Sequence, residues 1–405
     1  MKKLRQTMVG ATVFVAVGVA VVPRVFALGF DNPDQDARAT AQGEAFVAQA
    51  DDASAIYYNP AGLTQLSGTE ITSGMELQFP DSHLEGAGSG GEMNTMSYIP
   101  QLFASTDFGL KQSPWRFGLG FMVPFGNVAD YSLKGPFRYS VTDASLAVYD
   151  IQPTVAFQVN DHLSLGVGLN IYLADTLLNE KVSFPGFPDG NFHFGGKGDA
   201  FGATAGLLWK ITPQHSIGLL YRSPFDINLK GNATLSTPVG PQTANATAEI
   251  PFPQSVKAGY AFRPIKQLKL EADVEWINWD TLNSLVLRSQ NVNLHATIPF
   301  NWQDSWYYEF GTQYEIDEHW TVRGGYIFSV NTVPNSTFSP SVPDANRHVF
   351  SVGGGYSTTR YSVDLVYQYS LSEDRTVTEK GSGSVADGTW QSNCQEIMIT
   401  TSLKF

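Results

Sequence analysis

Histidine, cysteine and serine build most catalytic and metal sites, and this sequence offers few arrangements of them. Its seven histidines are scattered, and none pairs at ligand spacing with carboxylates or with another histidine. The one cysteine, Cys394, cannot form an intramolecular disulfide, and there is no Cys-x-x-Cys pair or Cys/His cluster to hold a metal. Glycine-rich stretches at 166–170 and 353–355 lack the strand-to-helix context of a nucleotide loop. The sequence therefore predicts no catalytic residue, no metal site and no cofactor.

The chemistry that the side chains do offer is contact with apolar molecules. Four phenylalanines, Phe184, Phe187, Phe192 and Phe194, fall in one short stretch that is expected to form an exposed loop. Exposed apolar clusters usually contact something apolar, so this stretch is a candidate for capturing a hydrophobic ligand. Packing of the same rings against neighbouring loops is an equal alternative.

A second candidate lies in the stretch 115–125, where apolar and small residues alternate. Phe125 is expected to face outward with the other aromatic residues of this strand, and Pro124 to face inward. Proline removes a hydrogen bond from a strand ladder, so a kink at Pro124, followed by Gly126, would open the wall sideways. The alternative is that Pro124 merely begins a loop.

The third candidate is Asn59-Pro60-Ala61, near the end of the segment 29–63, which is the one part of the chain with a helical character. Asp34 or Asp36 is a candidate helix cap there. Because proline pushes the preceding residue out of the helical region, Asn59-Pro60 predicts a helix stop. The segment is too polar and alanine-rich to fold alone. It needs a host, and the lumen of a barrel would be one.

The elements that must position these residues are strands, because alternation with period two dominates the rest of the chain. In 266–280, Leu270 and Val274 fall on one face, and Glu271 and Asp273 fall on the other. Fourteen strands are expected, near 69–79, 95–107, 115–125, 146–159, 162–178, 198–211, 214–231, 245–262, 266–280, 304–316, 319–331, 345–358, 361–373 and 392–405. Fourteen is even, as single-chain bacterial barrels require. The fold class predicted is all-β, a 14-stranded antiparallel transmembrane β-barrel with a small N-terminal helical hatch that plugs the lumen.

Three patterns favour a barrel that turns its apolar face to lipid. Tight turns alternate with longer loops, which is typical of periplasmic and outer connections. The last strand ends on Phe405 in the alternating register. Aromatic residues gather near strand ends, as interfacial girdles require: Trp115, Phe125, Trp276, Trp279, Trp306, Trp320, Tyr356 and Tyr361.

The N-terminus predicts export. Residues 1–27 have a basic start, an apolar run and a small-residue cleavage site, which together indicate a secretory signal peptide. Without it the chain would carry 21 basic and 38 acidic residues, a net charge of −17, so nucleic acid is excluded as a partner. The organisation expected is signal peptide 1–27, hatch 28–66 and barrel 67–405, placed in the outer membrane of a Gram-negative cell.

Several motifs together resemble the FadL-type outer-membrane transporters of long-chain fatty acids and related hydrocarbons, over essentially the whole mature chain. The most specific piece is 50–53 followed by Asn59-Pro60-Ala61; the others are 29–30, 124–126, 221–223 with 229–232, and 333–334 with 343–347. The resemblance implies capture of ligand by outer loops, passage to an internal apolar site near Phe30, and lateral release at a gap beside Phe125-Gly126. One departure is that the loops near 179–197 and 232–244 are compact and lack amphipathic helices.

The function expected is passive uptake of hydrophobic compounds by a protein that is not an enzyme. Long-chain fatty acids are the substrate expected first, and aromatic or alkane hydrocarbons are the alternative substrates. A general diffusion porin is the alternative kind of protein. A lipase or protease would need a constellation that the sequence does not show, and an adhesin is a further alternative. The partners expected are the hydrophobic small molecule, outer-membrane lipid, and the barrel assembly machinery through Phe405. The chain is expected to act as a monomer.

Overall fold

The computed structural model describes residues 29–86, 92–94, 96–110, 113–290, 294–378 and 386–405. The proposed signal peptide, residues 1–27, lies outside the described residues. Period-two alternation shapes most of the chain: in β12 (Leu268–Ile277), Leu270 and Val274 are about 40% exposed, whereas Glu271 and Asp273 are buried. The apolar face of the sheet is therefore its outer face. No helix in the described part is long and apolar enough to cross a membrane.

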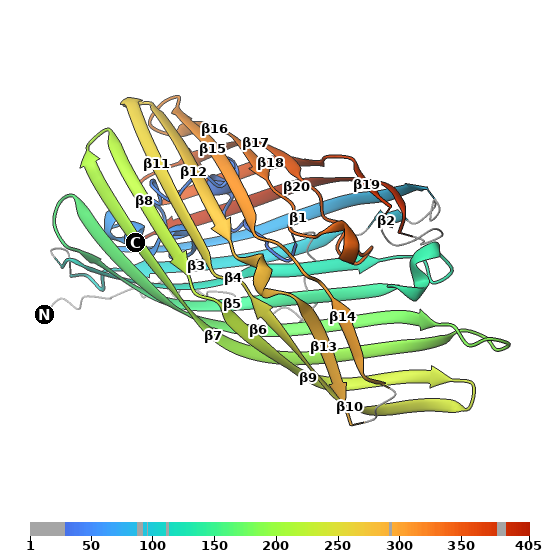
Figure 1. Ribbon diagram of the computed structural model, residues 1–405. Coiled ribbons are helices and arrows are strands. Elements are labelled where there is room, and N and C mark those ends of the chain that lie inside the picture. The colour runs from blue at the N-terminus through green and yellow to red at the C-terminus, as the bar shows by residue number, and fades with distance from the viewer. Residues whose placement is uncertain (1–28, 87–91, 95, 111–112, 291–293, 379–385) are drawn as a thin grey trace, which may run out of the picture.

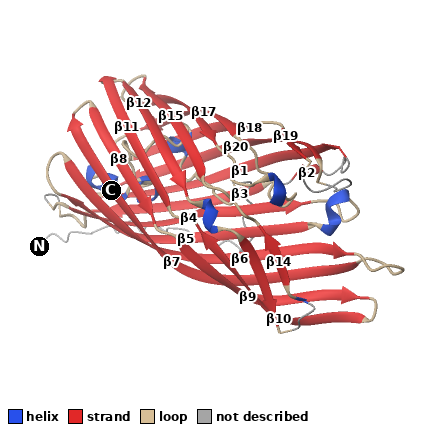
Figure 2. Cartoon of the chain, in the orientation of Figure 1, coloured by secondary structure: helices blue, strands red, loops and turns tan. Residues whose placement is uncertain are grey.

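Fourteen antiparallel strands of the described chain close into a barrel, as the alternation predicted (Figures 1 and 2). In order around the wall they are β1 (Thr69–Gly86), β3 (Ser97–Thr106), β4 (Trp115–Asp130), β5 (Asp143–Gln158), β6 (Leu163–Val182), β7 (Gly190–Thr212), β8 (His215–Arg222), β11 (Ser255–Ile265), β12, β15 (Ser305–Glu315), β16 (Trp320–Ser329), β17 (Arg347–Ser357), β18 (Tyr361–Ser372) and β20 (Gly388–Lys404). The ring closes where β1 pairs with β20, from Glu70↔Lys404 to Gly86↔Gly388.

One end of the barrel carries the tight turns and the C-terminus, and we call it the turn end. The opposite end, the hairpin end, carries long strand extensions that project beyond the wall (Figure 1). These are β9 (Phe225–Thr237), which pairs with the first part of β7, and β10 (Gly240–Phe252), which pairs with β9. The shorter strands are β2 (Glu92–Asn94), β13 (Ser284–Ser289), β14 (Ala296–Pro299) and β19 (Arg375–Val377).

Two expected strands, 214–231 and 245–262, are wrong as single elements. Each is two strands, because the chain leaves the wall after Arg222 and returns to it at Ser255. Pro224 and Pro253 lie at the two breaks and cannot donate to a ladder. The wall therefore uses only β8 and β11 at these positions, and the excursion between them builds the β9–β10 hairpin.

Residues 29–66, which we call the plug, lie inside the barrel. The segment is mostly irregular, with α1 (Ala37–Thr40), α2 (Ala55–Tyr58) and the 3₁₀-helix η1 (Pro60–Gln65). Asp36 caps α1 by accepting a hydrogen bond from the Arg38 N–H. Nearly all of its residues are buried, and it contacts strands on opposite sides of the wall, with η1 against β5, β6 and β7 and α1 against β17 and β18. In the described part of the chain, 3₁₀-helices also lie in connections, namely η2 (Pro136–Tyr139), η3 (Trp279–Thr281) and η5 (Asn335–Thr337).

Candidate functional site

The plug is held by hydrogen bonds from inward-facing polar side chains of the wall. The Asp273 carboxylate accepts from the Phe46 and Val47 N–H groups, both at 3.0 Å, and Glu271 accepts from the Ala48 N–H at 2.6 Å. Buried backbone N–H groups outside helices need such partners. In a soluble protein the alternating acidic residues of β12 would face water. Here they accept hydrogen bonds from backbone N–H groups of the plug.

Glycines of the wall form a collar against which the plug packs. A side chain at any of these positions would collide with the plug, because an added Cβ would lie within 2.9 Å of a plug atom. They are Gly118, Gly120, Gly166, Gly206, Gly218, Gly259, Gly311, Gly325 and Gly353. The plug therefore approaches the wall around much of its circumference and leaves little room for water to pass.

Asn59-Pro60-Ala61 lies at the centre of this packing. The Asn59 side chain caps η1 by accepting from the Ala61 N–H at 3.1 Å, and its amide donates to the carbonyls of Val47 at 2.7 Å and Leu207 at 3.0 Å. Pro60 occupies the first position of η1, where its missing N–H costs nothing. The motif thus ends α2, begins η1 and joins the plug to β7.

On the turn side of the plug the lumen is polar. Asp51 forms ion pairs of 2.7 Å with both Arg38 and Lys269. Although burial favours the protonated form of Asp51, these two cations hold its pKa below the ordinary value. Two cavities open here, of about 370 and 390 Å³, and both are lined mostly by polar side chains. An apolar molecule would meet an aqueous, charged mouth at this end.

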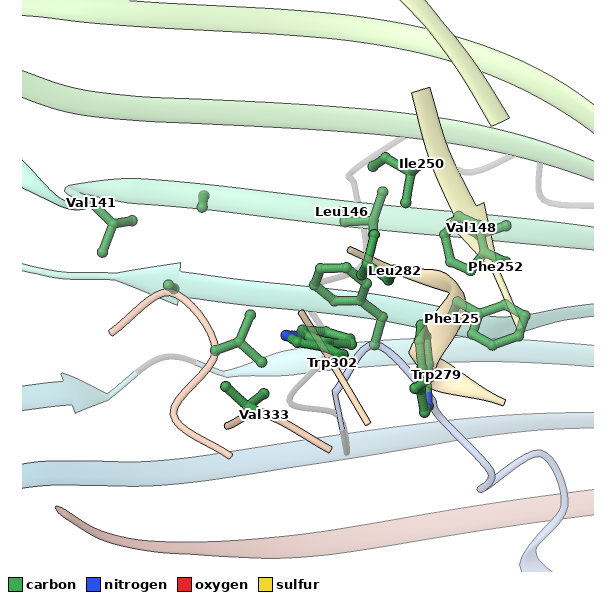
Figure 3. Close-up of a cluster of buried hydrophobic side chains, with 14 of the residues drawn as sticks. Phe125, Val141, Leu146, Val148, Ile250, Phe252, Trp279, Leu282, Trp302 and Val333 are labelled. Carbon is green, nitrogen blue, oxygen red and sulfur yellow. The ribbon is translucent and has the colours of Figure 1, made fainter. Parts of the chain in front are cut away.

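On the hairpin side of the plug the lumen is aromatic. Figure 3 shows Phe125, Phe252, Trp279 and Trp302 converging there with aliphatic side chains. We call the cluster of Phe30, Phe125, Phe225, Phe252, Trp279 and Trp302 the chamber. The ring centroids of Phe30 and Trp302 are 4.7 Å apart, and those of Phe125 and Phe252 are 4.9 Å apart. The two ligand residues predicted from the sequence, Phe30 and Phe125, are thus brought to one place.

The orientation expected for Phe125 is wrong. It is 7% exposed and points into the chamber, because the pairing of β4 with β5 shifts between Met122 and Phe125. An irregularity of this kind moves the following side chains to the other face of a strand. Val123 is also buried, where it packs against Ile99 and Tyr149. Trp279, expected in the aromatic girdle, likewise lies in the chamber on η3 and is fully buried.

β4 also separates from its other neighbour. It pairs with β3 only from Leu102↔Phe121 to Thr106↔Phe117, so 97–101 of β3 and 122–130 of β4 do not pair with each other. We call this unpaired part of the wall the gap. Ile99 and Val123 fill it with side chains in contact with each other, packed by Tyr149.

Where β4 does not pair with β3, its backbone at residues 123, 124 and 126 forms hydrogen bonds with the plug. The Asn32 N–H donates to the Pro124 carbonyl and the Gly126 N–H donates to the Phe30 carbonyl, each at 2.8 Å. Gln35 uses both ends of its amide on the backbone of Val123. Pro124 and Gly126 thus lie where β4 leaves the wall and pairs inward with the N-terminal part of the plug.

A charged group closes the bottom of the chamber. Arg222 forms an ion pair of 3.3 Å with Glu275, donates to the Tyr57 carbonyl at 2.9 Å and lies over the Tyr57 ring. Burial raises the pKa of the nearby Asp31 to about 7, and the charge of Glu275 contributes to the rise. Arg222 and Asp31 line a cavity of only about 20 Å³ beside Phe125 and Phe225. A long ligand therefore requires the rings to move apart.

The four phenylalanines predicted on one outer loop are divided by the structure. Phe187 is 62% exposed and Phe184 is partly exposed, both in the turn between β6 and β7. Phe192 and Phe194 lie in β7 itself and are buried in the cluster that includes the chamber, so placing them on the loop is wrong. The sequence reasoning also missed Trp302, Phe225 and Phe252, and it named Arg222 only within a motif of the resemblance. Phe225, Phe252 and Arg222 lie on β9, β10 and β8, and Trp302 lies in the connection between β14 and β15. No local pattern could have joined them.

Comparison with known proteins gives one consistent result. The sequence profile of the family described as outer membrane protein transport protein (OMPP1/FadL/TodX) matches residues 18–405. An outer membrane protein of Neisseria meningitidis serogroup B is 25% identical, over 90% of each chain. The long-chain fatty acid transport protein of Shigella flexneri is 22% identical, over 82% of this chain and 84% of that protein.

Solved structures show the same fold. A FadL homologue of Pseudomonas aeruginosa superposes with a TM-score of 0.84 at 20% identity, covering 93% of this chain and all of the other. The toluene transporter TodX of Pseudomonas putida superposes with a TM-score of 0.76 at 19% identity, covering 94% of this chain and all of the other. At these identities the likeness concerns the fold alone.

Proposed function

The chain belongs to the OMPP1/FadL/TodX family of outer-membrane transport proteins, and from that premise we propose that it takes up long-chain fatty acids passively. In this proposal the acid is captured at the hairpin end, enters the chamber, and leaves sideways into the membrane through the gap between β3 and β4. The protein is an outer-membrane β-barrel that transports hydrophobic compounds. The substrate and the lateral route are the proposal.

The contrast between the two sides of the plug supports a lateral route. Each CH₂ group transferred from an apolar site to water costs about 0.8 kcal/mol, so release of an alkyl chain into the charged turn end would be unfavourable. The plug and its ion pairs at Asp51 also obstruct that direction. A side exit lets the chain pass from the chamber to lipid without entering water.

The single observation that carries the proposal is the gap itself. A wall that faces lipid must satisfy its backbone polar groups, and an open edge between two neighbouring strands is otherwise not tolerated. Here the edge of β4 is satisfied by Asn32, Gln35 and Phe30 of the plug rather than by β3. The contact of Ile99 with Val123, packed by Tyr149, fills the gap, and apolar side chains can move without breaking a hydrogen bond.

A fatty acid is favoured over a neutral hydrocarbon by the charge beside the chamber. Arg222 places a guanidinium group next to Phe125 and Phe225, in a cavity that Asp31, Asp150 and Glu275 also line. Arginine suits a carboxylate, so the acid would exchange with Glu275 as the partner of Arg222. The curated relative from Shigella flexneri is named a long-chain fatty acid transport protein. Aromatic hydrocarbons are the second candidate, because the chamber is lined by rings and the toluene transporter TodX shares the fold.

The remaining parts of the proposal follow from the same route. Residues 28–66 act as a hatch held by Asn59, Pro60 and Ala61, within a barrel of residues 67–405. Phe184 and Phe187 at the hairpin end make first contact with the ligand, and Phe192 and Phe194 line the way inward. Phe405, exposed at the turn end, is the signal for the barrel assembly machinery. The chain acts as a monomer in outer-membrane lipid and has no catalytic activity.

Uptake measurements test the substrate. In cells that lack their own transporter, expression of this protein should raise the initial rate of radiolabelled oleate uptake at least about tenfold, and excess toluene should compete weakly. Arg222→Met should lower oleate uptake about tenfold and leave toluene uptake unchanged, because only the acid carries a charge. Toluene uptake with no effect on oleate would reject the fatty acid assignment. A steady ion conductance in planar bilayers would instead indicate a diffusion porin.

A further inference from the structure

Three carboxylates that play no part in the proposed route come together between the plug and the wall. Asp34 belongs to the plug, Glu76 to β1 and Glu396 to β20, and one oxygen of each lies within 4.8 Å of the other two. All three residues are at most 6% exposed. They lie at the seam of the barrel, because β1 and β20 are the strands whose pairing closes the ring.

Neutral amides provide the donors at this cluster. Gln368 donates to Asp34 at 3.1 Å and to Glu396 at 2.5 Å, and Gln78 donates to Glu76 at 2.8 Å. Among the described residues, none of the three carboxylates forms an ion pair with lysine or arginine. Burying several carboxylates without a cation close enough to form an ion pair is costly, and a bound cation would offset that cost.

Two buried oxygens near the cluster have no partner in the described structure. Glu76, 1% exposed, uses one carboxylate oxygen on Gln78, and its Oε2 has no hydrogen-bond donor although the side chain faces Asp34 and Glu396. Glu44 of the plug is fully buried, and its Oε2 is also unpartnered. An orphaned buried acceptor normally indicates a missing donor, an ion or a proton.

We propose that Asp34, Glu76 and Glu396 bind one calcium ion. The donor set consists of carboxylate oxygens, which suit a hard cation, whereas zinc prefers nitrogen and sulfur ligands. Calcium lies about 2.3–2.6 Å from its ligands, so two ligands on opposite sides of the ion are about 5 Å apart. Oxygens that all lie within 4.8 Å of one another can therefore share one such ion. Glu44 is placed to support the site from the plug side.

The site would fix the same segment of the plug that satisfies β4 at the gap. Asn32, two residues before Asp34, accepts a hydrogen bond from Gln78 at 3.3 Å. Asn32 also donates from its backbone N–H to the Pro124 carbonyl at 2.8 Å and from its side-chain amide to the Val123 carbonyl at 3.0 Å. An ion on Asp34 would thereby fasten residues 32–35 to the closing strands of the barrel and hold the inner partner of β4 in place.

Calcium content after folding tests this proposal. Because the site is buried, the ion must be bound as the barrel folds. The full chain is refolded into detergent either with calcium or with the chelator EGTA, and free metal is removed by gel filtration. The amount of calcium bound per chain is then measured by elemental mass spectrometry. We expect about one calcium per chain for the wild type folded with calcium. Glu76→Gln and Glu396→Gln should retain at least about tenfold less, since each removes a charged ligand.

Glu70→Gln is the matched control, because Glu70 lies on the same strand as Glu76, is also buried and already has Lys404 as its partner. It should retain calcium like the wild type. The unfolding temperature should rise by about 5 °C in calcium for the wild type and this control, and should not change for Glu76→Gln. Folding of each variant is checked by heat-modifiable mobility in SDS gels. The proposal would be overturned by a folded wild type that holds no calcium or that prefers magnesium. A folded Glu76→Gln that retains calcium would also overturn it. If neither Glu76→Gln nor Glu396→Gln folds, the calcium and magnesium contents of the wild type decide.

Discussion

Asn59 shows how much one side chain does at the junction between plug and wall. Its amide group makes three hydrogen bonds, to the Val47 carbonyl, the Leu207 carbonyl and the Ala61 N–H, and the residue is fully buried. The first bond is within the plug, the second is to the wall and the third caps η1. Loss of this side chain should therefore loosen the plug from the barrel and not only fray a helix.

Asn59→Ala should lower the free energy of unfolding by about 2–3 kcal/mol, since it removes a cap and leaves two buried carbonyls unpaired. Denaturant titration of the refolded protein, followed by tryptophan fluorescence, measures this. The control is Asn191→Ala, because Asn191 is exposed and accepts only a hydrogen bond from Lys181. Equal losses for the two variants would show that Asn59 does not hold the plug.

At this scale the sequence predicted residue types better than their orientation. Phe30 and Phe125 are together in the structure, but the alternation of 115–125 put Phe125 on the lipid face. The shift between Met122 and Phe125 depends on hydrogen bonds to Asn32 and Gln35, about ninety residues earlier. Tertiary contacts of this kind cannot be read from the local pattern, although Pro124 did indicate where the strand would be irregular.

Among the elements, β16 presents two adjacent glycines to opposite environments. A Cβ on Gly325 would lie 2.0 Å from the Gly43 nitrogen of the plug, whereas a Cβ on Gly324 would find ordinary contacts of 3.7 Å or more. The first glycine is required by the close approach of the plug, and the second is not. Substituting each glycine in turn therefore distinguishes a collision with the plug, at Gly325, from the general effect of replacing a glycine in a strand, at Gly324.

Gly325→Ala should displace the plug, because backbone atoms on both sides cannot yield to the added methyl group. We expect a folded barrel whose plug is cleaved at least about tenfold faster by added protease than that of the wild type, since loosened segments are cleaved preferentially. Gly324→Ala should be cleaved at the wild-type rate. Equal protection of the plug in both variants would contradict the role assigned to the glycine collar.

The strands themselves were mostly predictable, because the lipid-facing wall requires strict alternation and tight turns between its strands. The exceptions were the excursion between Arg222 and Ser255, where β9 and β10 continue the alternation outside the wall, and the short outer strands. A period of two does not distinguish a wall strand from a hairpin that extends it. Pro224 and Pro253 were the signal for the two breaks.

Taken as a whole, the molecule is divided by its plug into a charged turn side and an aromatic hairpin side, and the gap borders the aromatic side. The sequence could predict the barrel and the plug from patterns along the chain. It could not predict the chamber or the carboxylate cluster, because their members lie far apart in sequence and meet only when the barrel closes around the plug. The proposed route depends on the chamber, and the proposed calcium site on the carboxylate cluster.

A reversible cross-link across the gap tests its role most directly. In a Cys394→Ser background, Ile99→Cys with Val123→Cys places two thiols where the side chains of β3 and β4 are in contact. The matched control is Leu102→Cys with Phe121→Cys, which joins the same two strands where they already pair. If ligand leaves through the gap, oxidation of the first pair should lower oleate uptake at least about tenfold and reduction should restore it, because a disulfide prevents the strands from separating. The control pair should show no change, and oleate uptake that is unaffected by a fully formed disulfide between positions 99 and 123 would contradict lateral release.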